Sequence, residues 1–555
     1  MCPGKNIKVS FMQWQIVLPF TLFMFHSLIF RSWLIDDAGI SFAYARNFIH
    51  GHGFVAQLGA APVEGFSNFL WTLLISPMFI TDPVNPVFAI KLISLSCIFG
   101  VFVIVNKIYH SLFGNCWWSR VATATSLAFL SVNTSFVVWT TSGLENPLYV
   151  LLCALYCHLT TLYAVNGSNR SSRLVVHAGL SAAGLALTRP DGVIFFAAFP
   201  AVLAICVMCD YVTWKDHGKK LMVFIISAML PVVACTIFRI FYFGDIFPNT
   251  YYAKDGPTIR DIFRLVCLAK EYLDKTYDLF YGIFSWRAGL GILILLVGSF
   301  YLLLGRKKTS IVFLFPAFLC SLAVYCLLPQ DWMGEYRFAS PFFMLFSVVL
   351  FALFVHSIRS NFLFPPLLRK AAFLTIATAF LSHSIIIYAP RTYRFANNPT
   401  VPFEDLCRVG VKFNYYAEEL EISNASLLSA DLGGVLYYSK HRVYDLAGLC
   451  DRKIARLIHG ASVDLRTYVL SEICPTFIFI HNPFLKNTGF SSDIRFSELY
   501  EVIETRVSGG TVCSGDYVLK TALKSGKDIE RLRRKISEKR LYVPDREKRQ
   551  PFPRC

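Results

Sequence analysis

The sequence predicts an α-helical protein that crosses a membrane many times and carries an α/β domain after its last span. Three observations support this fold class. First, 55% of the 555 residues are hydrophobic and 16% are charged, against roughly 45–50% and about 25% in soluble proteins. Second, about eleven apolar stretches are long enough to cross a hydrocarbon core of about 30 Å. Third, these stretches stop near Arg391, and short alternating segments replace them.

The spans begin close to the N-terminus. The first is interpreted as retained, because no small-residue cleavage site follows it. The predicted spans cover residues 15–34, 87–106, 121–140, 147–165, 174–188, 193–212, 221–243, 288–304, 311–328, 340–358 and 371–389. The apolar segment 69–80 is short and contains Pro77. We therefore expect an interfacial helix there rather than a span.

Basic residues indicate the orientation of these spans. With the N-terminus in the cytoplasm, every cytoplasmic loop is basic, and the outer loops are rich in Gly, Pro, Asn, Trp and acids. This is the distribution that the positive-inside rule describes. The net charge of +17 then fits cytoplasmic loops and anionic headgroups better than nucleic acid.

Three regions follow from this reading. Residues 1–390 form a membrane domain, whose first outer loop covers residues 35–86. Residues 391–523 form an α/β domain on the outer side, because short β-like runs alternate there with the helical segments 451–460 and 464–473. Residues 524–555 form a basic tail, for which we expect a solvated helix followed by a disordered end.

The strongest local signal is the acid pair Asp36 and Asp37, which ends the first apolar segment at the outer interface. Ionisable groups at membrane depth are costly and usually functional. Considered alone, the pair is slightly more typical of an ordinary solvated end of a helix than of a functional site. Arg46 follows about 14 Å further along a helix and is no direct partner of the acids. His50 and His52 lie between glycines, which indicates a turn rather than a metal site.

Later outer loops add acids, cations, Asn and Tyr. Taken singly, a loop residue of these types more often forms structural hydrogen bonds than takes part in catalysis. The residues are Glu145, Arg189, Asp191, Asp245, Asn249, Tyr252, Lys254, Asp331 and Arg337. Together they predict a chemistry in which an acid takes a proton from a hydroxyl and cations neutralise a leaving phosphate, as sugar transfer from a lipid phosphate requires.

Several motifs, in order along residues 36 to about 460, resemble a known family. They are DDAGISFAYARNFIHGHGFV, PVEGFSNFLW, SGLENPLY, LTRPDG, FGDIFPNTYYAK, DWMGEYRFASP and DLGGVLYYS with VYDLAGLCD. This pattern is similar to that of bacterial polytopic GT-C glycosyltransferases, which use polyprenyl-phosphate sugars. Within that class it most resembles mycobacterial terminal β-(1→2)-arabinofuranosyltransferases. The resemblance implies a bundle of about eleven spans, an outer first loop with interfacial helices, and an outer α/β domain.

The resemblance also implies an inverting sugar transfer. Asp36 would deprotonate the acceptor hydroxyl, and Asp37 would either orient the acceptor or tune the acidity of Asp36. The implied ligands of the leaving phosphate are Arg189, Lys254 and Arg337, and the implied sugar- or acceptor-binding residues are Arg46, Glu64, Asn249, Tyr252 and Asp331. We expect no cofactor and no metal ligand, with the divalent-metal requirement left open. The expected partners are a polyprenyl-phosphate sugar, an envelope glycan or glycolipid and membrane lipids, at a bacterial inner membrane.

Two other classes of function are alternatives to the glycosyltransferase. A transporter or flippase of lipid-linked glycans should carry mid-membrane polar residues, broken helices and internal repeats, and the sequence shows few charges in its spans and no visible repeat. A non-enzymatic scaffold for envelope assembly is disfavoured, weakly, by the acids gathered at one face. The sequence has no P-loop or GxGxxG after a strand, so no nucleotide donor is indicated.

Overall fold

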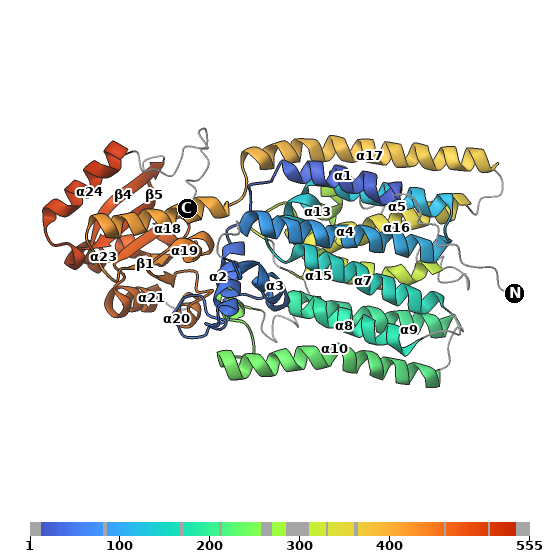
Figure 1. Cartoon of the computed structure of the whole chain (residues 1–555), viewed down its shortest axis with the longest axis horizontal. Helices are drawn as coiled ribbons and strands as arrows, with labels where there is room; N and C mark the ends of the chain where they lie inside the picture. Colours follow the sequence, from blue (N-terminus) through green and yellow to red (C-terminus); the bar gives the residue numbers. More distant parts are fainter. Residues whose placement is uncertain are drawn as a thin grey trace. The chain divides into compact units, whose positions relative to one another are not determined.

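The computed structural model describes residues 13–81, 86–166, 171–209, 214–256, 269–284, 310–328, 331–359, 365–459, 462–508 and 511–539. The chain divides into two compact units (Figure 1). Unit 1 contains residues 1–32, 87–235 and 259–400, and unit 2 contains residues 33–86, 236–258 and 401–555. Two segments that the sequence assigns to the membrane domain, 33–86 and 236–258, therefore belong to the same compact unit as the C-terminal domain.

Unit 1 is a bundle of long helices that run alongside one another (Figure 1). Its principal helices are α1 (Trp14–Leu28), α4 (Pro86–Phe113), α5 (Trp117–Val132), α6 (Thr134–Thr140), α7 (Asn146–Val165), α8 (Ser172–Thr188), α9 (Ala198–Met208), α10 (Trp214–Phe243), α13 (Ala269–Phe284), α15 (Phe315–Leu327), α16 (Ser340–Arg359) and α17 (Pro366–Asn397). The last turns of α10 belong to unit 2. The helix α16 is hydrophobic on all sides and almost wholly buried, as expected for the core helix of a bundle.

Seven helical segments of the described chain are long and apolar enough to cross a membrane, and eight if the pair α5 and α6, bent by 75°, forms one span. The fold is that of a multi-pass membrane protein. Of the other predicted spans, α1 and α8 have 15 and 17 residues, and 288–304 lies outside the described residues. The number of eleven spans stays a prediction. Segment 69–80 forms the short helices α3 (Phe69–Ile75) and η1 (Ser76–Phe79), and their length fits the expectation that it does not cross.

Unit 2 is built on a five-stranded sheet with the strand order β2-β1-β3-β5-β4. The strands are β1 (Ser426–Ser429), β2 (Arg442–Asp445), β3 (Phe477–His481), β4 (Tyr500–Ser508) and β5 (Thr511–Leu519). The strands β2, β1 and β3 are parallel, and β5 pairs antiparallel with both β3 and β4. The five β-like runs of the sequence therefore form strands, as predicted.

Helices cover both faces of this sheet. On one face, Leu427 and Phe477 join a core with α18 (Phe403–Glu419), α19 (Gly433–Tyr438) and α2 (Ala38–Ile49). On the other face, Leu428 and Ile478 pack with helices of the segment 451–500. Because Ala43 and Tyr44 of α2 are fully buried in the first core, the first outer loop is an integral part of unit 2.

The basic tail begins with α24 (Gly526–Lys539), which confirms the predicted helix. It differs from the expectation in one respect, because it is not solvated on all sides. Ile529 is 5% exposed and Leu532 1% exposed, and both belong to the core shared with α18. Their spacing of three residues places them on one face, a short apolar stripe that the high charge of the segment conceals. Residues 540–555 lie outside the described chain.

Candidate functional site

Asp36 is fixed in unit 2 by backbone pairing with a segment far along the chain. Its N–H donates to the carbonyl of Val401 at 3.0 Å, and the N–H of Phe403 donates to the carbonyl of Leu34 at 2.9 Å. An isolated bridge joins Ile35 to Pro402 between these bonds. The backbone of the first acid is therefore placed by the start of α18.

The carboxylate of Asp36 accepts hydrogen bonds with both oxygens. Gly433 N–H donates to Oδ2 at 3.0 Å and Gly434 N–H to Oδ1 at 2.6 Å, and Asp36 is 4% exposed. A Cβ atom at Gly433 would lie 1.7 Å from the carbonyl oxygen of Asp36, so only glycine permits this approach. Burial raises the pKa of Asp36, while the amides of Gly434 and Gly433 act in the opposite direction.

Asp37 has different surroundings. It occupies the N-cap position of α2 and is half-buried. Its carboxylate is therefore nearer to solvent than that of Asp36, although the two residues are adjacent. The sequence locates the pair but does not distinguish its members, because the amides that hold Asp36 come from the start of α19, 397 and 398 residues away.

A second ionisable pair, Asp431 and His481, lies close by: Asp431 comes two residues before Gly433, and His481 ends β3. Asp431 Oδ2 is 2.7 Å from Nε2 of His481, and Nδ1 of His481 is 2.7 Å from the carbonyl oxygen of Asn482. Both ring nitrogens face acceptors, which the doubly protonated ring satisfies. The hydrogen bond to Asp431 raises the pKa of His481, and the charge of Asp431 in turn raises the pKa of Asp36. Sequence analysis assigned no role to either residue, although Asp431 begins the motif DLGG.

Glu64 and Asn249 come together in unit 2. The N–H of Asn249 donates to the carbonyl of Glu64 at 2.9 Å, and its side-chain amide donates to the carbonyls of Gly448 and Leu449 at 2.7 and 2.9 Å. The Glu64 carboxylate is 2% exposed and forms an ion pair with Arg239. Burial raises the pKa of Glu64 and Arg239 opposes this rise. Both side chains thus hold the loops of unit 2 in place in this structure.

The remaining predicted residues of unit 2 are more exposed. Tyr252 lies in α11 (Asn249–Ala253), with the guanidinium of Arg456 4.8 Å from its ring centre. Lys254 caps α11 at its C-terminus and is exposed. Arg46 lies over the ring of Tyr437 at 4.4 Å.

In unit 1, the predicted phosphate ligand Arg189 is already paired with acids. It is 8% exposed, and its guanidinium lies 2.9 Å from Glu145 and 3.0 Å from Asp191. An arginine that is buried between two carboxylates is held by both. Its principal role in this structure is to join the start of α7 to the turn after α8.

Arg337 is less fully engaged. Its closest carboxylate oxygen, on Asp331, is 3.6 Å away, which is beyond a hydrogen bond. Its Nε is buried without a hydrogen-bond partner among the described residues. Arg337 and Arg189 both lie against the ring of Phe338, at 5.4 and 4.6 Å from its centre. The structure therefore brings Arg189 and Arg337 together at one aromatic ring, with Asp331 beside Arg337.

Each unit therefore contains one part of the predicted chemistry. Unit 2 holds the two acids and a His–Asp pair, and unit 1 holds two arginines with their acids. Within the described ranges, no group of three or more His, Cys, Asp or Glu side chains could hold a metal ion. The two parts correspond to a proton acceptor and to cationic groups that suit a phosphate.

Solved structures with a similar fold cover most of the chain. ArnT from Cupriavidus metallidurans in the apo state matches with a TM-score of 0.51 at 9% identity, over 92% of this chain and 98% of that chain. The same protein bound to undecaprenyl phosphate matches with a TM-score of 0.52 at 10% identity, over the same shares of both chains. The chain shares the fold of ArnT. The oligosaccharyltransferase of Archaeoglobus fulgidus in complex with Zn and sulfate matches with a TM-score of 0.50 at 12% identity, over 90% of this chain and 72% of that chain.

These likenesses confirm the GT-C fold that the sequence resemblance implied. Residues 411–523 match a family described as a domain of unknown function, DUF8728. This region contains the sheet of unit 2. No curated protein matches the sequence.

Proposed function

We propose that this chain is a membrane glycosyltransferase that moves a sugar from a polyprenyl phosphate to a hydroxyl group of a glycan or glycolipid. The observation that carries the proposal is the shared fold with ArnT, whose structure was solved with undecaprenyl phosphate, over 92% of this chain. The acid pair in unit 2 and the arginines in unit 1 support it, because they are the groups that such a transfer needs.

The proposed reaction is a single inverting displacement. A carboxylate takes the proton of the acceptor hydroxyl, whose oxygen attacks the anomeric carbon from the face opposite the phosphate. The bond from this carbon to the phosphate oxygen breaks, and polyprenyl phosphate leaves with the electron pair. A side chain must reach the acceptor to act as the base.

We assign proton transfer to Asp37 and positioning to Asp36, which reverses the roles in the sequence hypothesis. Asp37 is half-buried at the start of α2, whereas Asp36 is 4% exposed and both its oxygens accept backbone hydrogen bonds. Asp36 then holds the start of α2 against the start of α19 at Gly433. The pair remains the proposed catalytic centre.

Arg337 is the proposed principal ligand of the leaving phosphate. Its Nε has no partner in the described chain, its Nη1 donates to the weak acceptor Sδ of Met333 at 2.9 Å, and its carboxylate contact is long, so donors of its planar fork remain for an oxyanion. Arg189 supports it through their shared contact with Phe338. Lys254 is kept as a further cationic candidate, and Asp331, Arg46 and Tyr252 as candidates for sugar or acceptor hydroxyls.

Finer parts of the proposal rest on the sequence, either on the resemblance or on the distribution of basic residues among the loops. They are an arabinofuranosyl donor, an envelope glycan or glycolipid as acceptor, a bacterial inner membrane, an outer location for the C-terminal domain and the absence of a cofactor, with the metal requirement open. The basic cytoplasmic loops support the orientation.

The decisive experiment is a transfer assay with the full-length chain in lipid nanodiscs. Polyprenyl-phosphate arabinofuranose and polyprenyl-phosphate hexoses are offered separately with extracted envelope glycans. We expect transfer from one donor, and a loss of about 10²–10⁴ in turnover for Asp37→Asn with unchanged donor binding. Glu472→Gln, an exposed acid of the same unit, is the control.

Two outcomes would change the assignment. If Asp37→Asn keeps the wild-type rate and a folded Asp36→Asn variant is inactive, the base is Asp36, as the sequence hypothesis held. If no polyprenyl-phosphate sugar is consumed by the wild-type chain, the transferase proposal is wrong.

A further inference from the structure

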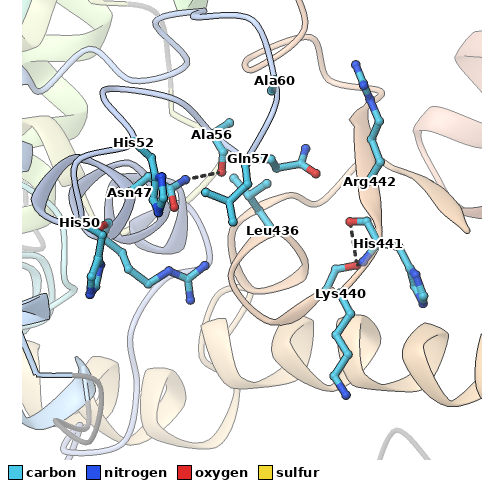
Figure 2. Close-up of a pocket in the computed structure, with 13 residues that line it drawn as sticks. Asn47, His50, His52, Ala56, Gln57, Ala60, Leu436, Lys440, His441 and Arg442 are labelled. Atoms are coloured by element: carbon cyan, nitrogen blue, oxygen red, sulfur yellow. Dashed lines mark hydrogen bonds between the residues drawn. The ribbon is translucent and has the colours of Figure 1, made fainter. Parts of the chain in front are cut away.

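Unit 2 contains a cavity of about 560 Å³ to which no role has been given (Figure 2). One wall is the C-terminal part of α2 with the loop that follows it, up to residue 60. The other wall is formed by residues 436–442, between α19 and β2. Arg46 lies nine residues after Asp37, so the cavity begins about 14 Å along α2 from the acid pair.

The lining of this cavity is strongly basic. Six of its residues carry cationic or imidazole side chains: Arg46, His50, His52, Lys440, His441 and Arg442. No Asp or Glu is among the lining residues. Outside the lining, Asp451 interacts electrostatically with Arg442. Three permanent positive charges with no acid among the lining residues give this concave surface a positive potential that attracts anions.

The two walls are held in a fixed arrangement. The side-chain amide of Gln57 donates to the carbonyl of Val443 at 2.7 Å and accepts from its N–H at 2.8 Å, which joins the walls directly. Asn47 donates to the carbonyls of Val55 and Ala56 at 2.8 and 3.2 Å, and Figure 2 marks its bond to Ala56. Hydrogen bonds of the chain itself therefore hold the two walls together, so little ordering is required on binding.

Arg46 is also ordered before any ligand arrives. Its guanidinium stacks on Tyr437, and Nη1 donates to the Tyr437 carbonyl at 3.3 Å. A guanidinium has five N–H donors in a rigid fork, so others remain for an anion. Nε2 of His441 is buried and has no hydrogen-bond partner within the described residues.

The arrangement of the charges selects the kind of anion. In Figure 2, Lys440 and Arg442 extend in different directions from the same wall, and His50 and His52 lie on the opposite wall. Charge is thus spread along the cavity instead of converging on one point. Arginine forks suit phosphate oxygens, and the volume leaves space for a group attached to the phosphate.

We propose that this cavity binds a phosphate group, carried by a sugar. Arg46 contacts the phosphate oxygens with its fork, and the charges of Lys440 and Arg442, spread along the opposite wall, attract the anion through their positive potential without both contacting it. The inference goes beyond the proposed transfer, because binding requires neither donor nor turnover. A sugar phosphate of this kind would engage unit 2 at a point remote from the acids.

The test is calorimetric titration of the purified full-length chain in detergent with three probes: inorganic phosphate, glucose 1-phosphate, and micelles containing phosphatidylglycerol. We expect glucose 1-phosphate to bind, and Arg46→Gln and Arg442→Gln each to weaken binding roughly 10- to 100-fold, the range for losing a charged hydrogen bond. Arg442 is exposed, so its variant leaves the fold intact if Arg46→Gln does not. Lys524→Gln, a cation of unit 2 outside the lining, should bind as wild type.

The probes separate the sources of the phosphate. Tighter binding of glucose 1-phosphate than of inorganic phosphate supports a sugar-borne group, and equal affinities support free phosphate as the ligand. Binding of the lipid micelles alone would overturn the sugar assignment in favour of a lipid headgroup. Absence of binding to all three probes, or binding that both arginine variants leave unchanged, would overturn the proposal.

Discussion

At the scale of single residues, adjacency in sequence hides a difference in environment. Asp36 and Asp37 are equivalent to any analysis of local pattern, because both end the same apolar segment. The structure distinguishes them, because the amides of Gly433 and Gly434 both donate to the carboxylate of Asp36. The motif DLGG can be identified in the sequence, but the residue that its amides bind cannot. Every residue type except proline has a backbone N–H, so the sequence does not indicate which amides bind a carboxylate.

This difference predicts that the same substitution, Asp to Asn, changes the stability of the protein at position 36 but not at position 37. In Asp36→Asn, the new NH₂ group faces a backbone N–H that needs an acceptor, and an unsatisfied buried donor costs about 1–3 kcal/mol. We expect thermal unfolding of the purified full-length chain to occur at lower temperature for Asp36→Asn, and near the wild-type temperature for Asp37→Asn. Equal unfolding temperatures for Asp36→Asn and wild type would contradict the positioning role.

His481 predicts a dependence of stability on pH. Its pKa is raised by the hydrogen bond to Asp431, so the folded state holds the proton more tightly than the unfolded chain, where the His pKa is about 6.5. The resulting stabilisation is complete below that value and is lost as pH rises through the higher folded pKa. In unfolding measurements across this window, the wild-type chain should lose more stability than His481→Gln. A constant difference between the two at all pH values would refute this linkage.

The two arginines of unit 1 should respond differently to truncation. Arg189→Ala leaves Glu145 and Asp191 buried without their cation, which costs about 3–5 kcal/mol. Arg337→Ala leaves only the distant Asp331, so the folded state should survive while the affinity for polyprenyl phosphate falls. The measurements are thermal unfolding and lipid-phosphate binding of each variant. Strong destabilisation by Arg337→Ala with unchanged lipid binding would assign Arg337 to structure instead.

At the scale of elements, the sequence predicts strands and long helices well and their assignment to compact units poorly. The runs that became β1 to β5 are short segments, some continuously apolar such as β3 and some mixed, and such short-range patterns are local properties of the sequence. The inclusion of α2 in the core of unit 2 is not local, because its apolar face would equally suit a membrane interface. Ala43 and Tyr44 are fully buried, so α2 packs in the core of unit 2 rather than at a membrane interface. This packing depends on the shape of α18 and α19.

The helix α24 is the element where composition misleads most, and it allows a direct test. Leu532 is 1% exposed within the core of unit 2, whereas Arg534 on the same helix is exposed. Leu532→Ala should destabilise the unit by about 2–5 kcal/mol, as for other buried leucines, and Arg534→Ala by less than about 0.5 kcal/mol. Denaturant unfolding that is followed by fluorescence of the full-length chain measures both. Similar small effects for the two variants would mean that α24 contributes little to the core.

At the scale of the whole molecule, the fold is set by pattern more than by residue identity. The chain shares the fold of ArnT over 92% of its length with 9–10% identity. Membrane physics explains how a fold can persist at such low identity, because any apolar helices of sufficient length satisfy the constraints that a bilayer places on a spanning segment. The same argument makes the orientation of the chain predictable, because charge bias acts on each short loop independently.

The orientation is tested by single cysteines at exposed positions. Lys254 belongs to a loop assigned to the outer side, and Arg120 and Arg173 to loops assigned to the cytoplasm; all three are exposed. In a background without the 16 native cysteines, a membrane-impermeant maleimide added to intact cells should label Lys254→Cys and spare Arg120→Cys and Arg173→Cys. Permeabilised cells should show labelling of all three, which controls for reactivity. Labelling of the two arginine positions but not of position 254 in intact cells would mean that the topology is inverted. The acid pair would then lie on the cytoplasmic side. A donor assembled in the cytoplasm would need no translocation before transfer.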